Sequence, residues 1–366
     1  MTVGTKKQIV EQHQKNVWLN SAIPAVTPVG AQDFSADGFY APLDERIIAS
    51  AAEALEAGQT HYVDVPGIAP LRQAIADYLN ATYGTALAQG NVIVTAGAQE
   101  SRFLTIQMLS EATGKIAIPS VVHPGVLKAI GVRPLTVTPM AVDSRLLATV
   151  ESIQAALEAG NRLILLESPS RLTGAVYDAA TVQAIQTLIV KYEATLIWDQ
   201  GFAPWVTDYA AAKAGEQVVA IGEAFPGSGL SSWFIGYIAA PTALVPTMQS
   251  QKQIMAICTS TAAQYAALEA SKLFGDIQHS QLQRLQAARQ TLVGLLQAQV
   301  EVISGAAANV VAVRLGGGQK EQAISRLEAA GYRVSDGAAF GAADVVRLSV
   351  SHSDAAETAA RLVQGA

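Results

Sequence analysis

The feature that most constrains the fold is a set of short segments that are apolar on both faces and end at polar or glycine residues. They include residues 91–97 (NVIVTAG), 162–170 (RLILLESPS) and 194–200 (ATLIWDQ), and segments with helical spacing alternate with them. Strands without a polar face are typical of a parallel sheet that helices cover on both sides. We therefore predict an α/β fold, with a three-layer large domain around a mostly parallel, mixed sheet.

The pattern changes after residue 242. A long helical region at about 245–300 precedes short strand-like segments at 308–315 and 345–351, and a helix is predicted between them at 319–330. This order of elements indicates a second, smaller domain of the α+β class.

Three parts are expected along the chain, without a linker long enough to separate them. They are an N-terminal arm at residues 1–40 that packs on the small domain, a large domain at 41–285 and a small C-terminal domain at 286–366. The arm contains Pro24 and Pro28 and has little periodicity, so we expect it to complete the small domain rather than to fold alone.

The composition excludes several classes of protein. Half of the 366 residues are hydrophobic and 15% are charged, so the chain can bury a large core and is not disordered. The single cysteine, Cys258, cannot form an intrachain disulfide, which favours a cytoplasmic location. A net charge of −6 without a long basic run gives no indication of nucleic-acid binding, and no apolar run suits a membrane span. The histidines are scattered, so no metal site is expected.

Open α/β sheets bind their ligands beyond the carboxyl ends of the strands, and several polar residues fall there. Asp199 follows the apolar Leu196-Ile197-Trp198, where a carboxylate is costly to bury without a partner, which favours a functional role over a helix cap. The turn Gly97-Ala98-Gln99 has the form of an anion cradle made of backbone N–H groups, with an ordinary strand-to-helix turn as the alternative.

The order of these segments resembles one family, the class I/II aminotransferases of the pyridoxal-phosphate fold type I, which are similar to aspartate aminotransferase. The segments that carry the resemblance are residues 61–79, 91–100, 167–174, 196–202, 229–241 and 331–351. The resemblance implies an amino or keto acid as substrate, pyridoxal or pyridoxamine phosphate as cofactor, and a homodimer with its sites at the subunit interface.

The resemblance also implies a role for individual residues. Arg347 matches the arginine that binds the substrate carboxylate, with a surface salt bridge as the alternative. Asp199 matches the partner of the cofactor's ring nitrogen, and His123 lies near the position of the ring that stacks on the cofactor, unless it is a plain loop histidine. Tyr62 matches a tyrosine that reaches the phosphate of the neighbouring subunit, unless it is a half-buried loop residue. The full set of expected cofactor-binding residues is Gly97, Ala98, Gln99, His123, Arg171, Asp199, Phe202, Ser228 and Tyr62.

The family's Schiff-base lysine is missing from its expected position. Three residues before Gly229 the chain has Pro226, and the nearest lysines, Lys213 and Lys252, lie in polar stretches typical of solvated surface. Three further cofactor contacts change: Phe234 stands in place of a phosphate-binding arginine, Arg171 in place of an asparagine and Phe202 in place of a tyrosine. We expect any cofactor to be held weakly and without a covalent bond.

Three hypotheses follow. In the first, the chain is a catalytically inactive aminotransferase-like protein that serves as a ligand-binding or partner subunit. In the second, it is an enzyme that uses the scaffold without a covalently held cofactor, and either holds the amine form of the cofactor noncovalently or catalyses different chemistry on an amino or keto acid, which the retained Asp199 and Arg347 favour. In the third, it is an ordinary aminotransferase with a displaced lysine.

Overall fold

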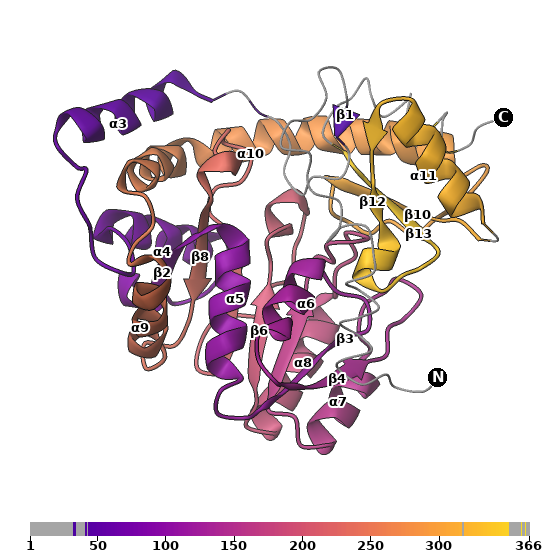
Figure 1. The fold of residues 1–366 in the computed structure, drawn as a ribbon, viewed down its shortest axis with the longest axis horizontal. Helices are drawn as coiled ribbons and strands as arrows, with labels where there is room; N and C mark the ends of the chain where they lie inside the picture. The colour runs from indigo at the N-terminus through magenta and orange to yellow at the C-terminus, as the bar shows by residue number, and fades with distance from the viewer. Residues whose placement is uncertain are drawn as a thin grey trace.

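A seven-stranded sheet forms the centre of the computed structural model, which describes residues 32–33, 41, 43–316, 318–350, 360 and 363 (Figure 1). The strand order is β2-β8-β7-β6-β5-β3-β4, and only β8 among these strands runs antiparallel to its neighbours. The strands are β2 (Val92–Ala96), β3 (Lys115–Pro119), β4 (Thr136–Met140), β5 (Leu163–Glu167), β6 (Thr195–Asp199), β7 (Val218–Glu223) and β8 (Ile235–Ala239). The predicted mostly parallel, mixed sheet is confirmed.

Helices cover both faces of this sheet and make three layers. They are α4 (Ala69–Tyr83), α5 (Gly97–Leu109), α6 (Pro124–Gly131), α7 (Val150–Glu158), α8 (Ala179–Lys191) and α9 (Val245–Ala256), whereas α3 (Glu45–Glu56) packs on α10 (Thr261–Leu296). Alternate residues of β6 show the two faces: Ile197 packs in the core with α5 and α6, whereas Leu196 and Trp198 pack in the core with α7 and α8. Both faces of the strand are therefore buried, as its continuous apolar sequence predicts.

Strand β7 is an element that the sequence analysis did not identify. It lies between β6 and β8 and completes the sheet, with Ala220 opposite Trp198 on one side and Ala239 on the other. Its first five residues are buried. Its apolar run ends in Gly222 and Glu223, as the runs of the other strands end in glycine or polar residues, so the same sequence pattern could have predicted it.

The long helix α10 (Thr261–Leu296) connects the two halves of the molecule (Figure 1). It contacts α3 and α4, and it also contacts β9 and β10 of the small sheet. The helical region expected at about 245–300 is interrupted between α9 and α10, where Ile257 has a φ of 58°. The expected boundary between the large and the small domain, at 285/286, falls inside α10, which is continuous there. The boundary therefore stays a proposal.

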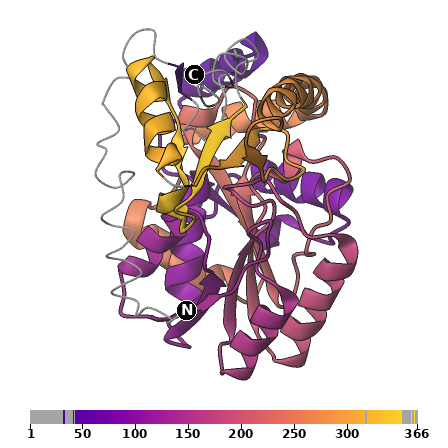
Figure 2. The same cartoon turned by 90° about the vertical axis from the view of Figure 1, so that its right-hand side faces the viewer.

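The small domain contains a four-stranded antiparallel sheet in the order β12-β13-β10-β9 (Figure 2). Its elements are β9 (Glu301–Val302), β10 (Val310–Arg314), α11 (Gln319–Ala329), β12 (Ser335–Asp336) and β13 (Val345–Ser349). From the N-terminal arm, the short strand β1 (Gln32–Asp33) pairs in parallel with β11 (Tyr332–Arg333). The rest of the predicted arm, 1–31 and 34–40, lies outside the described residues.

Four single turns of 3-10 helix complete the described elements: η1 (Gln89–Asn91), η2 (Ala203–Trp205), η3 (Ser231–Trp233) and η4 (Gly337–Phe340). Within the described ranges, no helix combines the length and the apolar character that crossing a membrane requires.

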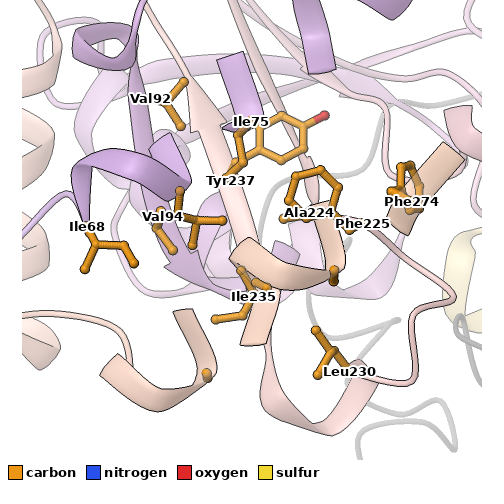
Figure 3. Close-up of a cluster of buried hydrophobic side chains, with 14 of the residues drawn as sticks. Ile68, Ile75, Val92, Val94, Ala224, Phe225, Leu230, Ile235, Tyr237 and Phe274 are labelled. Atoms are coloured by element: carbon orange, nitrogen blue, oxygen red, sulfur yellow. The ribbon is translucent and has the colours of Figure 1, made fainter. Parts of the chain in front are cut away.

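The turn before α4 packs tightly against β2, beside the apolar cluster of Figure 3, which contains Ile68 and Val94. Gly67 has a φ of 99°, and a Cβ there would lie 2.6 Å from Cγ2 of Val94 and 2.8 Å from Oε1 of Gln264. The same Gln264 oxygen accepts a hydrogen bond from the Ile68 backbone N–H at 2.8 Å. This position therefore needs glycine for both its backbone conformation and its space.

We expect Gly67→Ala to lower the free energy of unfolding by about 2–5 kcal/mol, as the sum of backbone strain and overpacking. Gly58→Ala is the matched control, because Gly58 has a φ of 74° but a Cβ there would meet nothing within 4 Å. The control should lose only about 1–2 kcal/mol. Urea unfolding of both variants measures the difference, and equal losses would contradict the close contact at Gly67.

Candidate functional site

A buried carboxylate at the carboxyl end of β6 is the centre of the candidate site. Asp199 is fully buried, and each of its oxygens accepts a hydrogen bond from a different arginine. Nε of Arg102, on α5, donates to Oδ2 at 2.8 Å, and Nη2 of Arg171, in the loop after β5, donates to Oδ1 at 2.9 Å. The backbone N–H of Gly201 also donates to Oδ1, at 3.1 Å. Both arginines are buried, so these are ion pairs in the protein interior.

A second carboxylate, Glu167, lies beside Asp199 because β5 and β6 are paired in register at these two residues. Burial would raise the pKa of Asp199, but the charges of Arg102 and Arg171 outweigh burial and hold it well below its usual range. Glu167 behaves in the opposite way: burial, and next the charge of Asp199, raise its pKa from 4.5 to about 7. The site therefore holds one permanently ionised carboxylate and one that gains or loses its proton near neutral pH.

Arg171 fills the space between Asp199 and an aromatic ring. Its guanidinium carbon lies 4.4 Å from the centroid of the Phe202 ring. Gly201 lies against the same guanidinium so closely that a Cβ at this position would overlap Nη2 of Arg171. The segment from Asp199 to Phe202 thus accommodates the arginine side chain that stands in place of the family's asparagine.

Arg347 approaches the same Phe202 ring from the small domain. It lies in β13, opposite Ala312 of β10, and is buried. Its guanidinium carbon lies 5.8 Å from the centroid of Phe202 and 5.9 Å from that of Phe340 in η4. The fold thus brings Arg347 and Arg171, which are 176 positions apart in the sequence, to the same aromatic ring.

His123 caps the N-terminus of α6 and faces the small domain. Its Nδ1 accepts a hydrogen bond from the Gly125 N–H at 2.9 Å, and its own backbone N–H donates to Oε1 of Glu167 at 2.9 Å. Its ring lies edge-to-face on Phe340, with centroids 5.8 Å apart. The residue is buried, so it has a defined structural environment rather than that of a plain loop histidine.

The predicted anion cradle lies at the start of α5. Gly97 has a φ of 75° and begins the helix directly after β2. Gln99 links the cradle to its surroundings: its Nε2 donates to the Gly125 carbonyl at 3.0 Å, and its Oε1 accepts from Nη1 of Arg102 at 3.4 Å. Phe234, which replaces the phosphate-binding arginine, is 61% exposed, and a Cβ on Gly97 would lie 3.6 Å from it.

The two candidate lysines, Lys213 and Lys252, lie in different environments. Lys213 is exposed. Lys252 is fully buried, so the expectation that it lies on the surface was wrong. Its Nζ donates to both carboxylate oxygens of Glu100 at 3.0 Å and to Oγ1 of Thr259 at 3.2 Å. This ion pair ties α9 to the first turn of α5.

The remaining expected site residues are placed differently. Tyr62 is 78% exposed. Ser228 is buried, and within the described part of the chain its Oγ has no hydrogen-bond partner. Sequence reasoning missed Arg102 and Glu167. The signal for Glu167 was an acid that ends an apolar strand, whereas Arg102 follows Glu100 and Ser101 and has no comparable signal in the sequence. No group of acidic, histidine and cysteine residues able to hold a metal ion occurs within the described ranges.

Pyridoxal phosphate, the cofactor that the resemblance implies, does not fit the ring end of this site. The carboxylate that would pair with a protonated ring nitrogen already holds two guanidinium groups. One of these groups, from Arg171, lies over the Phe202 ring and against Gly201. The site therefore contains Asp199 paired with two buried arginines, and a further buried arginine at position 347.

The raised pKa of Glu167 predicts a specific dependence of stability on pH. Between the pKa of 4.5 in the unfolded chain and about 7 in the folded protein, the native state holds a proton that the unfolded state releases. The free energy of unfolding should therefore fall as the pH rises through this window. Glu167→Gln, which carries no charge and keeps an oxygen to accept from His123, should remove this fall.

Urea unfolding from about pH 5 to pH 8 tests this, with Glu158→Gln as control. Glu158 is exposed, and hydrogen bonds from Gln154 and Tyr192 lower its pKa, so its replacement should leave the pH dependence in this range unchanged. A Glu167→Gln variant that declines with pH as steeply as the wild type would contradict the assignment.

Comparison with known proteins gives the family. The model of the family "Aminotransferase class I and II" matches residues 33–363. A probable aspartate aminotransferase of Methanocaldococcus jannaschii is 26% identical over 235 residues, which cover 62% of this chain and 63% of that protein. A probable aspartate/prephenate aminotransferase of Aquifex aeolicus is 27% identical over 334 residues, covering 85% and 83%.

Solved structures agree at the level of the fold. A mutant of Thermus thermophilus aspartate aminotransferase has a TM-score of 0.83 at 20% identity, covering 93% of this chain and 99% of that one. An aspartate aminotransferase from Rhodobacter sphaeroides has a TM-score of 0.82 at 23% identity, covering 94% and 95%. The chain thus spans slightly less than two thirds of the Methanocaldococcus protein but nearly all of the two structures. Because the family model matches residues 33–363, the chain belongs to the class I and II aminotransferase family.

Proposed function

We propose that this chain is an aminotransferase-family protein that binds the carboxylate of an amino or keto acid and does not carry out ordinary transamination. The observation that carries this proposal is the position of the lysines. Pro226 stands at the expected lysine position, and the two nearest lysines are engaged elsewhere or exposed.

A lysine that acts in this family must both form a covalent bond to the cofactor and move a proton. Lys252 would need to leave the carboxylate of Glu100, which would then be a buried anion without its cationic partner. Breaking a buried ion pair costs about 3–5 kcal/mol, which opposes such a movement. Lys213 is exposed and lies near Gly84, where a Cβ would come within 3.8 Å of its Nζ.

The carboxylate-binding part of the proposal depends on Arg347. A guanidinium is suited to hold a carboxylate by two parallel hydrogen bonds, and the fold keeps this one buried against the Phe202 ring that Arg171 also contacts. The relatives in the comparison are named as aspartate and aspartate/prephenate aminotransferases, so acidic amino acids and their keto acids are the first ligands to test.

The inactive ligand-binding or partner subunit remains the alternative reading of the same observations, and a displaced catalytic lysine is a further one. A weakly and noncovalently held pyridoxal or pyridoxamine phosphate is compatible with the proposal, as is no cofactor. We also propose a homodimer in the cytoplasm, as the family resemblance implies, with Tyr62 available to a second subunit because it is exposed.

The absence of an active lysine predicts the result of a labelling experiment. After incubation with pyridoxal phosphate and reduction with borohydride, peptide mass spectrometry should find Lys252 unmodified and no stoichiometric adduct. Exposed lysines can react weakly, so Lys213→Gln serves as the control for nonspecific labelling. Stoichiometric labelling of Lys213 or Lys252, together with conversion of aspartate and 2-oxoglutarate, would establish an ordinary aminotransferase instead.

The role of Arg347 predicts a loss of ligand affinity. Calorimetric titration with aspartate and with 2-oxoglutarate should show binding that Arg347→Gln weakens roughly 10- to 150-fold, the effect of losing about 1.5–3 kcal/mol of charge-assisted hydrogen bonding. Arg314→Gln is the matched control, because Arg314 lies in the same small sheet but pairs with Glu301 and Asp344 at the surface. Equal affinity in the wild type and the Arg347 variant would contradict the assignment.

A further inference from the structure

Asp199 is the residue on which a pyridine cofactor would depend, and its surroundings differ from what such a cofactor needs. Protonation of the ring nitrogen is stabilised by a carboxylate that is free to pair with it. Here Oδ2 pairs with Arg102 and Oδ1 pairs with Arg171, while Gly201 donates a further hydrogen bond to Oδ1. The single negative charge of the carboxylate is thus shared between two internal cations.

We propose that Arg102 and Arg171 have replaced the cofactor as the cationic partners of Asp199, so that this site is closed to pyridoxal and pyridoxamine phosphates whether or not they bind covalently. This inference deepens the proposed function, which itself leaves a noncovalent cofactor open. It concerns the ring end of the site and does not depend on the lysine at any position.

The packing around Arg171 supports the replacement. Arg171 is fully buried, and its guanidinium stacks at 4.4 Å on the ring of Phe202 while it pairs with Asp199. At Gly201 any larger residue would overlap this guanidinium. The glycine, the aromatic ring and the carboxylate together form a fitted environment for an arginine side chain, which is planar and suited to stacking.

Arg102 provides the second, independent contribution. It reaches Asp199 from α5, whereas Arg171 reaches it from the loop after β5. Nη1 of Arg102 also donates to Gln99 in the cradle turn, at 3.4 Å. Its side chain is 4% exposed and that of Asp199 is 0% exposed. The arginine therefore links the ring end of the site to the place where the phosphate of a cofactor would lie.

The electrostatics explain why a pyridinium ring would not displace these arginines. A ring that pairs with Asp199 must remove Arg102 or Arg171 from it, and the removed guanidinium would remain in the interior without its carboxylate. Removing one partner of a buried ion pair leaves an uncompensated charge, which is strongly unfavourable. Both arginines hold the pKa of Asp199 low, so the carboxylate stays charged and keeps them in place.

Pyridoxamine 5′-phosphate is the decisive probe, because its amine cannot form a Schiff base with any lysine. Calorimetric titration of the full-length wild type should show no saturable binding up to about 1 mM, and thermal melting should not shift with the probe. The double variant Arg102→Leu/Arg171→Asn frees Asp199 for a ring nitrogen and should bind the probe at least tenfold more tightly. The double variant Arg162→Leu/Arg314→Asn, which removes two arginines outside the site, should behave as the wild type.

A second pair of variants tests the same inference if the first double variant does not fold, or if the site binds the phosphate group of the probe too weakly. Phe234→Arg alters an exposed residue and supplies a positive charge beside the cradle. Adding Arg171→Asn to it should produce binding that Phe234→Arg alone lacks, and circular dichroism checks that each variant is folded. Tight binding of the probe by the wild type would overturn the inference, as would folded variants without any gain.

The two proposals fail separately. A stoichiometric lysine adduct with pyridoxal phosphate would overturn the proposed function. Binding of pyridoxamine phosphate by the wild type, with no lysine adduct, would leave the proposed function intact and overturn only the closure by Arg102 and Arg171.

Discussion

The ion pairs of Asp199 with two buried arginines are the interaction on which the rest of the site depends. A carboxylate at the end of β6 is enclosed by the sheet and its covering helices, so it must be paired to remain charged. Arg102 comes from α5 and Arg171 from the loop after β5, so the pairing joins three elements at one sheet edge. The position of Arg171 then determines the packing of Phe202 and requires glycine at 201.

The same pairing sets the behaviour of the neighbouring groups. Burial raises the pKa of Glu167, and the charge of Asp199, its partner in the β5–β6 register, raises it further. Its carboxyl oxygen accepts from His123, whose ring contacts Phe340 in the small domain. Asp199 and the small domain are thus connected through three contacts: the charge of Asp199 on Glu167, the hydrogen bond from His123 to Glu167, and the ring contact of His123 with Phe340.

Much of the fold was predictable because its cause is local. Segments without a polar face, alternating with helical segments, specify a covered sheet, and the turn at Gly97 follows from a strand that leads directly into a helix. Asp199 and Arg347 were also identified, since both are polar residues in or at the end of apolar strands. Strand β7 was missed although its apolar run ends in glycine and an acid, a form that the identified strands share.

The sequence by itself determined that a proline stands at position 226 and a phenylalanine at position 234. Only the tertiary structure decided where the remaining charges lie. Arg102 and Asp199 are 97 residues apart, and Lys252 and Glu100 are 152 apart. No local pattern encodes such a pairing, because a buried charge is stabilised by whichever opposite charge the fold brings within a few ångströms, and that depends on how distant elements pack.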